Sequence, residues 1–198
     1  DLRQRSLTMK PSIKLSANTL RLLDQLKRSD LPSLGAPEGS AQLSPGEISA
    51  RLDALADEWG CCHEQLVLLK AAALFWHDHL EASHEISQCI HSPEGSFLHG
   101  MMHRREPDWP NAKYWFHRVG DHPLYGLLAD RLKGLEGGQE LEEHPVIRND
   151  KWDPIAFVDR IEEHFQNRPG ALPPTQLMSI QQVEFETLIE WILNAYQV

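Results

Sequence analysis

Apolar residues in this chain recur at helical spacing, and no segment shows the sustained alternation of apolar and polar residues that builds a strand. Residues 16–28 place Leu20, Leu23 and Leu26 near one face of a predicted helix. Residues 175–196 predict a last helix, which carries apolar residues along its whole length. This periodicity favours an all-α fold.

Local signals for helix ends support the same fold class. Ser44, Pro45 and Glu47 match a capping box with proline at the first helical position. They predict a helix that runs to about Trp59 and ends at Gly60, since glycine is a favoured helix stop.

Further helices are expected between Gly60 and the last helix at 175–196. We predict a long helix over 63–91, one from Ser92-Pro93 or Ser96 to about Arg105, one capped by Asn111 and ended by Gly120, one over 122–135, and one from Asp153-Pro154 to about Gln166. The total of seven or eight helices indicates a single compact domain over residues 1–198, an irregular helical bundle. Residues 1–15 and the loop at 29–44, which is rich in Pro, Gly and Ser, are the segments most suited to be flexible.

Composition excludes several classes of partner. The 198 residues carry a formal net charge of -10, and the basic residues are not clustered as a nucleic-acid surface requires. No apolar run approaches the roughly 20 residues of a membrane span, and the first ten residues lack the apolar core of a signal peptide. Three cysteines, two of them adjacent, favour free thiols. We therefore expect a cytoplasmic protein with no nucleic-acid or membrane partner.

Histidine is concentrated in the middle of the chain. There are 11 histidines, and 8 of them lie in residues 77–122. On the long predicted helix, His77, Glu81 and His84 fall within about 60° of one another. Residues at positions i, i+4 and i+7 can meet one metal ion or one ligand, so these three side chains are candidate metal ligands.

A second histidine pair stands on the next predicted helix. His99 and His103 are four residues apart, a spacing that lets two imidazoles share a metal ion. Combined with the residues of the long helix, they predict a divalent metal site with three or four ligands. The alternative is that these histidines bond to backbone carbonyls or carboxylates in a polar seam of the core.

Residues 104–118, directly after the second histidine pair, carry several cationic and polar side chains in a chain of negative net charge. Arginine forks suit a carboxylate or phosphate, and a helix N-terminus at Asn111 also favours an anion. Glu106 could pair with an arginine or act as an acid or base. The alternative is a salt-bridge network that holds two helices together. The residues expected to bind an anionic substrate are Arg104, Arg105, Asn111, Lys113, Tyr114 and Arg118.

The two histidine-rich stretches also resemble a known family. "WHDHLEASHEISQ", followed by "MHRREPDWPNAKYWFHRVGDHPLY", is similar to a family of functionally uncharacterised proteins, mainly bacterial with some fungal members. The similarity covers about residues 74–126, and its signature reads HRREPDxxNAKYWFxRVGxHP. The resemblance implies that both stretches belong to one functional unit, and it implies no particular reaction or cofactor.

These observations lead to three hypotheses. The first is an enzyme that acts on a small anionic metabolite, with His77, His103 and Glu106 as acid–base residues and a metal ion as its potential cofactor. The second is a non-catalytic module that binds a small anion in the same pocket. The third is a structural protein with a buried polar network.

Overall fold

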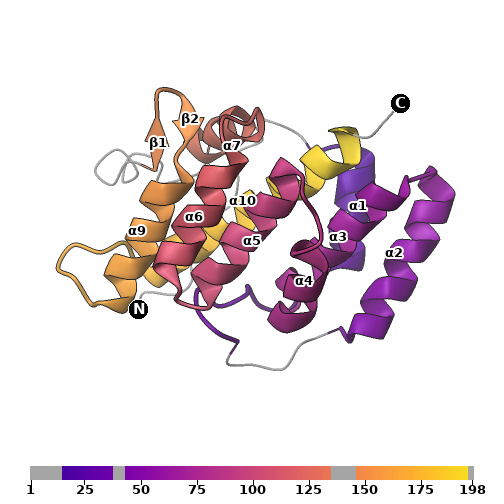
Figure 1. Cartoon of the computed structure of the whole chain (residues 1–198), viewed down its shortest axis with the longest axis horizontal. Helices are drawn as coiled ribbons and strands as arrows, with labels where there is room; N and C mark the ends of the chain where they lie inside the picture. Colours follow the sequence, from indigo (N-terminus) through magenta and orange to yellow (C-terminus); the bar gives the residue numbers. More distant parts are fainter. Residues whose placement is uncertain (1–14, 38–42, 135–145, 196–198) are drawn as a thin grey trace, which may run out of the picture.

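The computed structural model describes residues 15–37, 43–134 and 146–195, and this part of the chain contains nine α-helices and one two-stranded sheet (Figure 1). The all-α prediction is therefore confirmed. Residues 1–14 and 38–42, where flexible segments were predicted, lie outside the described residues. The elements are α1 (Ala17–Gln25), α2 (Pro45–Trp59), α3 (His63–Trp76), α4 (Leu80–Ser87), α5 (Pro93–Arg105), α6 (Trp109–Val119), α7 (Leu124–Lys133), β1 (Ile147–Arg148), β2 (Lys151–Trp152), α9 (Pro154–Phe165) and α10 (Pro174–Ala195).

The predicted ends of α2 are confirmed in detail. The Ser44 side chain accepts a hydrogen bond from the Glu47 N–H, and the Glu47 carboxylate accepts one from the Ser44 N–H at 2.9 Å. At the other end Gly60 has a φ of 67°, a left-handed conformation that glycine adopts without steric cost. Both signals act over a few residues, which is why the sequence was sufficient to find them.

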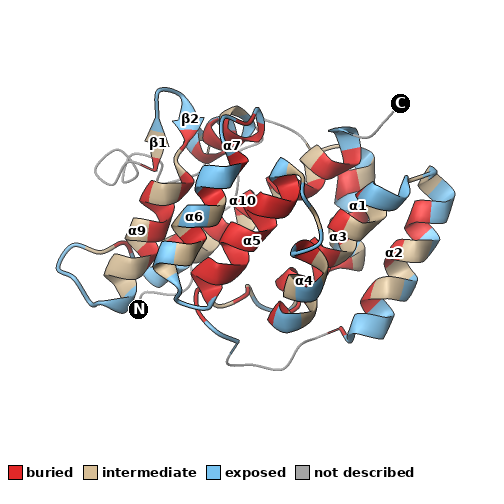
Figure 2. Ribbon diagram, in the orientation of Figure 1, coloured by how far each residue is buried: buried red, intermediate tan, exposed pale blue. Residues whose placement is uncertain are grey.

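Two helices organise the core. In α5 every residue from Glu94 to Arg105 is buried, and the helix packs against α3, α4 and α6 (Figure 2). The longest helix, α10, runs behind α5 and contacts α1, α3, α7 and α9 (Figure 1). No helix in the described part of the chain combines the length and apolar character of a membrane span.

The close approach of α5 and α6 depends on a glycine. A Cβ atom placed on Gly100 would lie 2.9 Å from three atoms of the Phe116 ring. Phe116 is itself buried and packs edge-on against Phe97, with ring centroids 5.5 Å apart. The ring therefore has little room to move, and only glycine lets the two helices lie this close.

The single long helix predicted over 63–91 is wrong, because the chain breaks after Trp76 and resumes as α4 at Leu80. Between them Asp78 has a φ of 68°, which lies in the left-handed region that an α-helix cannot continue through. The consequence for the predicted site is direct, since residues before and after the break no longer share one helix face.

A buried ion cluster holds this break. The Asp78 carboxylate lies 2.6 Å from Nη2 of Arg105 and 2.7 Å from Nη2 of Arg28. Arg105 also donates a hydrogen bond of 3.1 Å to the carbonyl oxygen of Phe75, a residue in the last turn of α3. The three charged side chains are nearly inaccessible to solvent, so each depends on the others.

Two further local predictions need correction. Asn111 does not cap α6: Asp108 does, and its carboxylate accepts a hydrogen bond from the Asn111 N–H at 3.3 Å. Proline is well tolerated in the first turn of a helix, so Pro110 lies inside α6 and the helix starts before it. The hairpin of β1 and β2 was not predicted, because strands of two residues show no alternation.

The first part of the loop, residues 29–37, is held by side chains from distant helices. The Gln181 side chain on α10 donates to the carbonyl oxygens of Pro32 and Ser33 at 3.2 and 3.3 Å. Arg105 donates through Nε to the carbonyl oxygen of Gly35 at 3.3 Å. The loop therefore closes over the same arginine that holds Asp78.

Replacing Gly100 by alanine is expected to destabilise the fold. The added Cβ would overlap the Phe116 ring, and overpacking of this kind costs about 1–3 kcal/mol of unfolding free energy. The matched control is Gly126→Ala in α7, where a Cβ meets nothing within 4 Å and alanine should stabilise the helix by about 0.5–1 kcal/mol. Urea unfolding measures both changes, and equal stability of the two variants would contradict the close packing of α5 and α6.

Candidate metal centre

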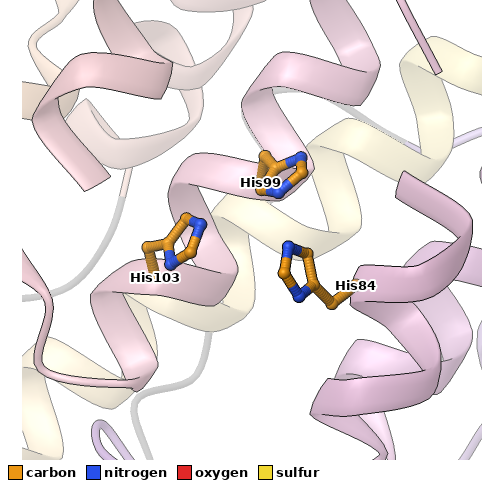
Figure 3. A group of neighbouring side chains, drawn as sticks. All are labelled: His84, His99 and His103. Carbon is orange, nitrogen blue, oxygen red and sulfur yellow. The ribbon is translucent and has the colours of Figure 1, made fainter. Parts of the chain in front are cut away.

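Three histidines from two helices converge in the middle of the molecule. His84 points from α4 toward His99 and His103 of α5, and the three rings face one another (Figure 3). One ring nitrogen from each lies within 4.8 Å of the others. His99 and His103 are buried, whereas His84 is half-buried and forms the side nearest solvent. We call these three residues the histidine cluster.

The rings are close but not yet in the geometry of a bound metal. The His99 and His103 rings stack with centroids 5.2 Å apart, and His84 meets them edge-on at 4.8 and 5.5 Å. Zinc–nitrogen bonds of about 2.0–2.1 Å in a tetrahedral site put two nitrogens about 3.4 Å apart. A rotation of these side chains that moves the nitrogens by about an ångström would meet that requirement.

His99 is held by an aromatic platform. Its ring stacks on Trp115 of α6, with centroids 3.9 Å apart and an angle of 6° between the two ring planes. Its Nδ1 atom is buried and has no hydrogen-bond partner among the described residues. A buried nitrogen without a partner is costly, so this atom marks a position where a ligand would be favourable.

His103 is held by polar neighbours instead. Its Nδ1 lies 3.0 Å from the Oε2 atom of Glu106, one turn further along. The Asn111 amide nitrogen lies 3.4 Å from Nδ1 and 3.2 Å from Nε2. These nearly equal distances place the amide against the ring of His103, in contact with both of its nitrogens.

The buried imidazoles are neutral near pH 7. Burial lowers the pKa of His99 to about 4, and the nearby His84 and His103 act in the same direction. Burial lowers the pKa of His103 as well, although the carboxylate of Glu106 opposes this change. A neutral imidazole keeps the lone pair that a metal ion needs.

The structure separates two of the five predicted metal ligands from the other three. His77 lies before the break at Asp78, and its Nε2 lies 3.2 Å from the carbonyl oxygen of Leu26. Burial lowers its pKa to about 4, so it is a neutral core histidine. Glu81 is exposed on α4 and is not part of the cluster. The break at Asp78 separates His77 from α4, whereas Glu81 is on the same helix as His84 but faces solvent.

Most of the predicted cations already have partners within the protein. Arg104 lies fully buried beside Glu184 of α10, with Nη1 and Oε1 2.9 Å apart. Arg105 belongs to the ion cluster around Asp78. Lys113 bonds to Asp159 of α9 at 2.6 Å, and this contact raises the pKa of its ammonium group.

Arg118 is arranged differently. Its guanidinium donates to the hydroxyl of Tyr114 at 3.2 Å and lies 5.0 Å from the centroid of the Trp115 ring. Both Arg118 and Tyr114 are exposed. No carboxylate pairs with Arg118 in the described part of the chain. Because Trp115 also stacks on His99, this cation lies beside the histidine cluster.

Sequence reasoning did not identify Glu184 or the stacking role of Trp115. Glu184 is 80 residues from Arg104, and its only local signal is a carboxylate between the apolar residues Val183 and Phe185. Such a carboxylate on a buried helix face indicates a buried partner of opposite charge. No local signal shows that Trp115 stacks on His99, since this contact depends on how α5 and α6 pack.

Comparisons with models of protein families, with curated proteins and with solved structures find no match. The resemblance to the family with the HRREPDxxNAKYWFxRVGxHP signature therefore stays a prediction. Function has to be inferred from the geometry and chemistry of the histidine cluster.

We expect the protein to lose stability as the pH falls from about 6.5 to 4.5. The pKa values of His99 and His77 are lower in the folded state than their ordinary 6.5, so the unfolded chain binds protons first. The contribution of each is complete above pH 6.5 and decreases as the pH falls toward 4, by up to about 3 kcal/mol.

Urea unfolding at a series of pH values measures this dependence. His99→Gln removes one titrating group, so the unfolding free energy should depend less steeply on pH than in the wild type, and the double variant with His77→Gln less steeply still. A wild-type unfolding free energy that stays constant across this window would contradict the burial of neutral imidazoles.

Proposed function

We propose that the protein binds a divalent transition metal ion through His84, His99 and His103, as the centre of an enzyme that acts on a small anionic metabolite. The observation that carries the proposal is the buried Nδ1 atom of His99, which has no partner among the described residues and lies within a group of three imidazoles. A metal ion would supply the interaction that this part of the core otherwise lacks.

The ligand set supports this choice of metal class. Imidazole suits zinc, copper, iron and nickel, and sites with three protein ligands leave a further position open. The lowered pKa values of His99 and His103 keep both rings neutral and ready to bind. When bound, such a metal ion lowers the pKa of a water molecule and polarises a substrate oxygen.

The surroundings support an anionic substrate. Arg118 is the exposed cation next to the cluster, and in the described part of the chain it has no carboxylate partner. Its planar fork can hold a carboxylate or phosphate in two hydrogen bonds. Of the residues expected to act as acid or base, His103 and Glu106 lie at this centre, whereas His77 bonds to Leu26.

Two alternatives keep specific support. A non-catalytic module would bind the same anion beside Arg118 without turnover. The enzyme and the non-catalytic module would use the same site geometry. A structural role is favoured for Arg104 and Arg105 alone, since both are buried and paired with Glu184 and Asp78. These two arginines would then maintain the fold around the centre rather than bind substrate.

The cellular setting completes the proposal. Cys61, Cys62 and Cys89 are all free, which supports a reducing compartment such as the cytoplasm. The net charge of -10 argues against a nucleic-acid partner.

Metal binding is tested directly with Zn²⁺, Co²⁺, Ni²⁺, Mn²⁺ and Fe²⁺ added to chelator-treated protein. We expect one ion per chain. At a free concentration 100-fold above the dissociation constant, binding adds about 2.7 kcal/mol, which is about 5–10 °C in the thermal midpoint. His84→Ala removes the half-buried ligand and should weaken binding by at least about 100-fold.

The matched control is His117→Ala, which removes an exposed histidine of α6 that is not part of the cluster. It should bind the metal as the wild type does. Failure of the wild type to bind any of the five ions, or equal binding by both variants, would contradict the proposal.

Arg118→Gln is expected to weaken anion binding to the Co²⁺-loaded protein by roughly tenfold, the usual effect of losing a charged hydrogen bond. Inorganic phosphate and acetate serve as probes, and the change in Co²⁺ absorption reports their binding. Lys113→Gln is the control of equal charge change, because Lys113 is occupied by Asp159. An equal loss in both variants would show that only overall charge matters.

A further inference from the structure

We propose that Glu106 is a positioning residue that holds His103 in the tautomer and orientation of a metal ligand. This inference rests on the proposed metal centre. Its starting observation is the 3.0 Å contact between the Glu106 carboxylate and Nδ1 of His103. A carboxylate can only accept a hydrogen bond, so the proton of His103 lies on Nδ1 and the lone pair lies on Nε2.

The backbone at the end of α5 places this carboxylate. Glu106 is the C-terminal cap of the helix, and its N–H donates to the carbonyl oxygens of Met102 at 3.1 Å and His103 at 3.2 Å. Its side chain therefore starts one turn after His103, at a spacing that brings the two side chains together. The Glu106 side chain is 37% exposed, so solvent weakens the interaction but does not remove it.

A second contact restricts the same ring. The Asn111 amide of α6 lies against the ring of His103, 3.2 Å from Nε2 and 3.4 Å from Nδ1. Glu106 thus fixes the in-plane direction of the imidazole while Asn111 limits its rotation. Second contacts of this kind orient metal-bound histidines and raise their basicity.

The other two histidines of the cluster have no such partner. No hydrogen bond reaches a ring nitrogen of His84 or His99 within the described residues, and His99 is held by stacking on Trp115. Of the three imidazoles, His103 is consequently the one whose tautomer is determined before a metal arrives. Loss of Glu106 should therefore act on the centre through His103.

The experiment compares Glu106→Ala and Glu106→Gln with Asp108→Asn. Asp108 is the matched control: it carries the same charge two residues further along the chain and influences the pKa of His103, but its carboxylate accepts a hydrogen bond from the Asn111 N–H. Asparagine is an equally good helix cap, so α6 should be preserved. Competition with a chromogenic chelator measures Zn²⁺ affinity in each variant.

We expect Glu106→Ala to weaken Zn²⁺ binding by about tenfold, the lower end of what such partners contribute, because the carboxylate is partly exposed. Glu106→Gln can still accept a hydrogen bond and should fall between Glu106→Ala and the wild type. Asp108→Asn should stay within about twofold of the wild type. Equal losses in Glu106→Ala and Asp108→Asn would overturn the inference.

A measurement without metal separates the two proposals. Imidazole ¹⁵N chemical shifts of the metal-free wild type should show His103 with its proton on Nδ1, and Glu106→Ala should move the population toward the Nε2–H tautomer. Unchanged shifts in Glu106→Ala would refute the positioning role, whatever the metal affinity. Failure of the wild type to bind metal would instead refute the proposed function.

Discussion

The buried ion cluster of Asp78, Arg28 and Arg105 is the interaction on which the arrangement around the centre depends. Burying a charge costs several kcal/mol unless its partners are close and its remaining donors are satisfied. Here the carboxylate meets both guanidinium groups, and Arg105 also reaches the carbonyl oxygens of Phe75 and Gly35. These contacts hold Asp78 in its left-handed conformation between α3 and α4. They therefore determine the direction of α4 and the position of His84, the half-buried histidine of the cluster.

Helix α5 serves the core and the centre with different faces. Successive residues of a helix point about 100° apart, so the neighbours His103, Arg104 and Arg105 reach three different surroundings. Arg104 meets Glu184 of α10 and Arg105 meets the ion cluster, whereas His103 faces α4 and α6 beside His99. The two arginines anchor the helix deep in the core, and a firmly held helix is what keeps two imidazoles in a constant relation.

The close approach of α6 links packing to chemistry. Gly100 leaves room for Phe116 to lie against α5. Trp115, which precedes Phe116 in α6, then stacks flat on the ring of His99. The same helix carries Arg118 at the solvent side of that tryptophan. A substitution that moved α6 outward would therefore disturb the core, the support of one imidazole and the position of the nearby cation together.

Local signals in the sequence were sufficient for the helices with clear ends, such as α2 between Ser44 and Gly60, because capping acts within a few residues. They were also sufficient to name the histidines of the cluster, since clustering and four-residue spacing are local properties. They could not show that His77 stands apart, because the break at Asp78 depends on arginines distant in the chain. By itself the sequence determined the all-α fold class, the helices whose ends carry clear capping signals, and the histidines and cations that are candidates for binding a metal or an anion. Only the tertiary structure decided which of them meet and which are neutralised by buried partners, because those contacts form between helices far apart in sequence.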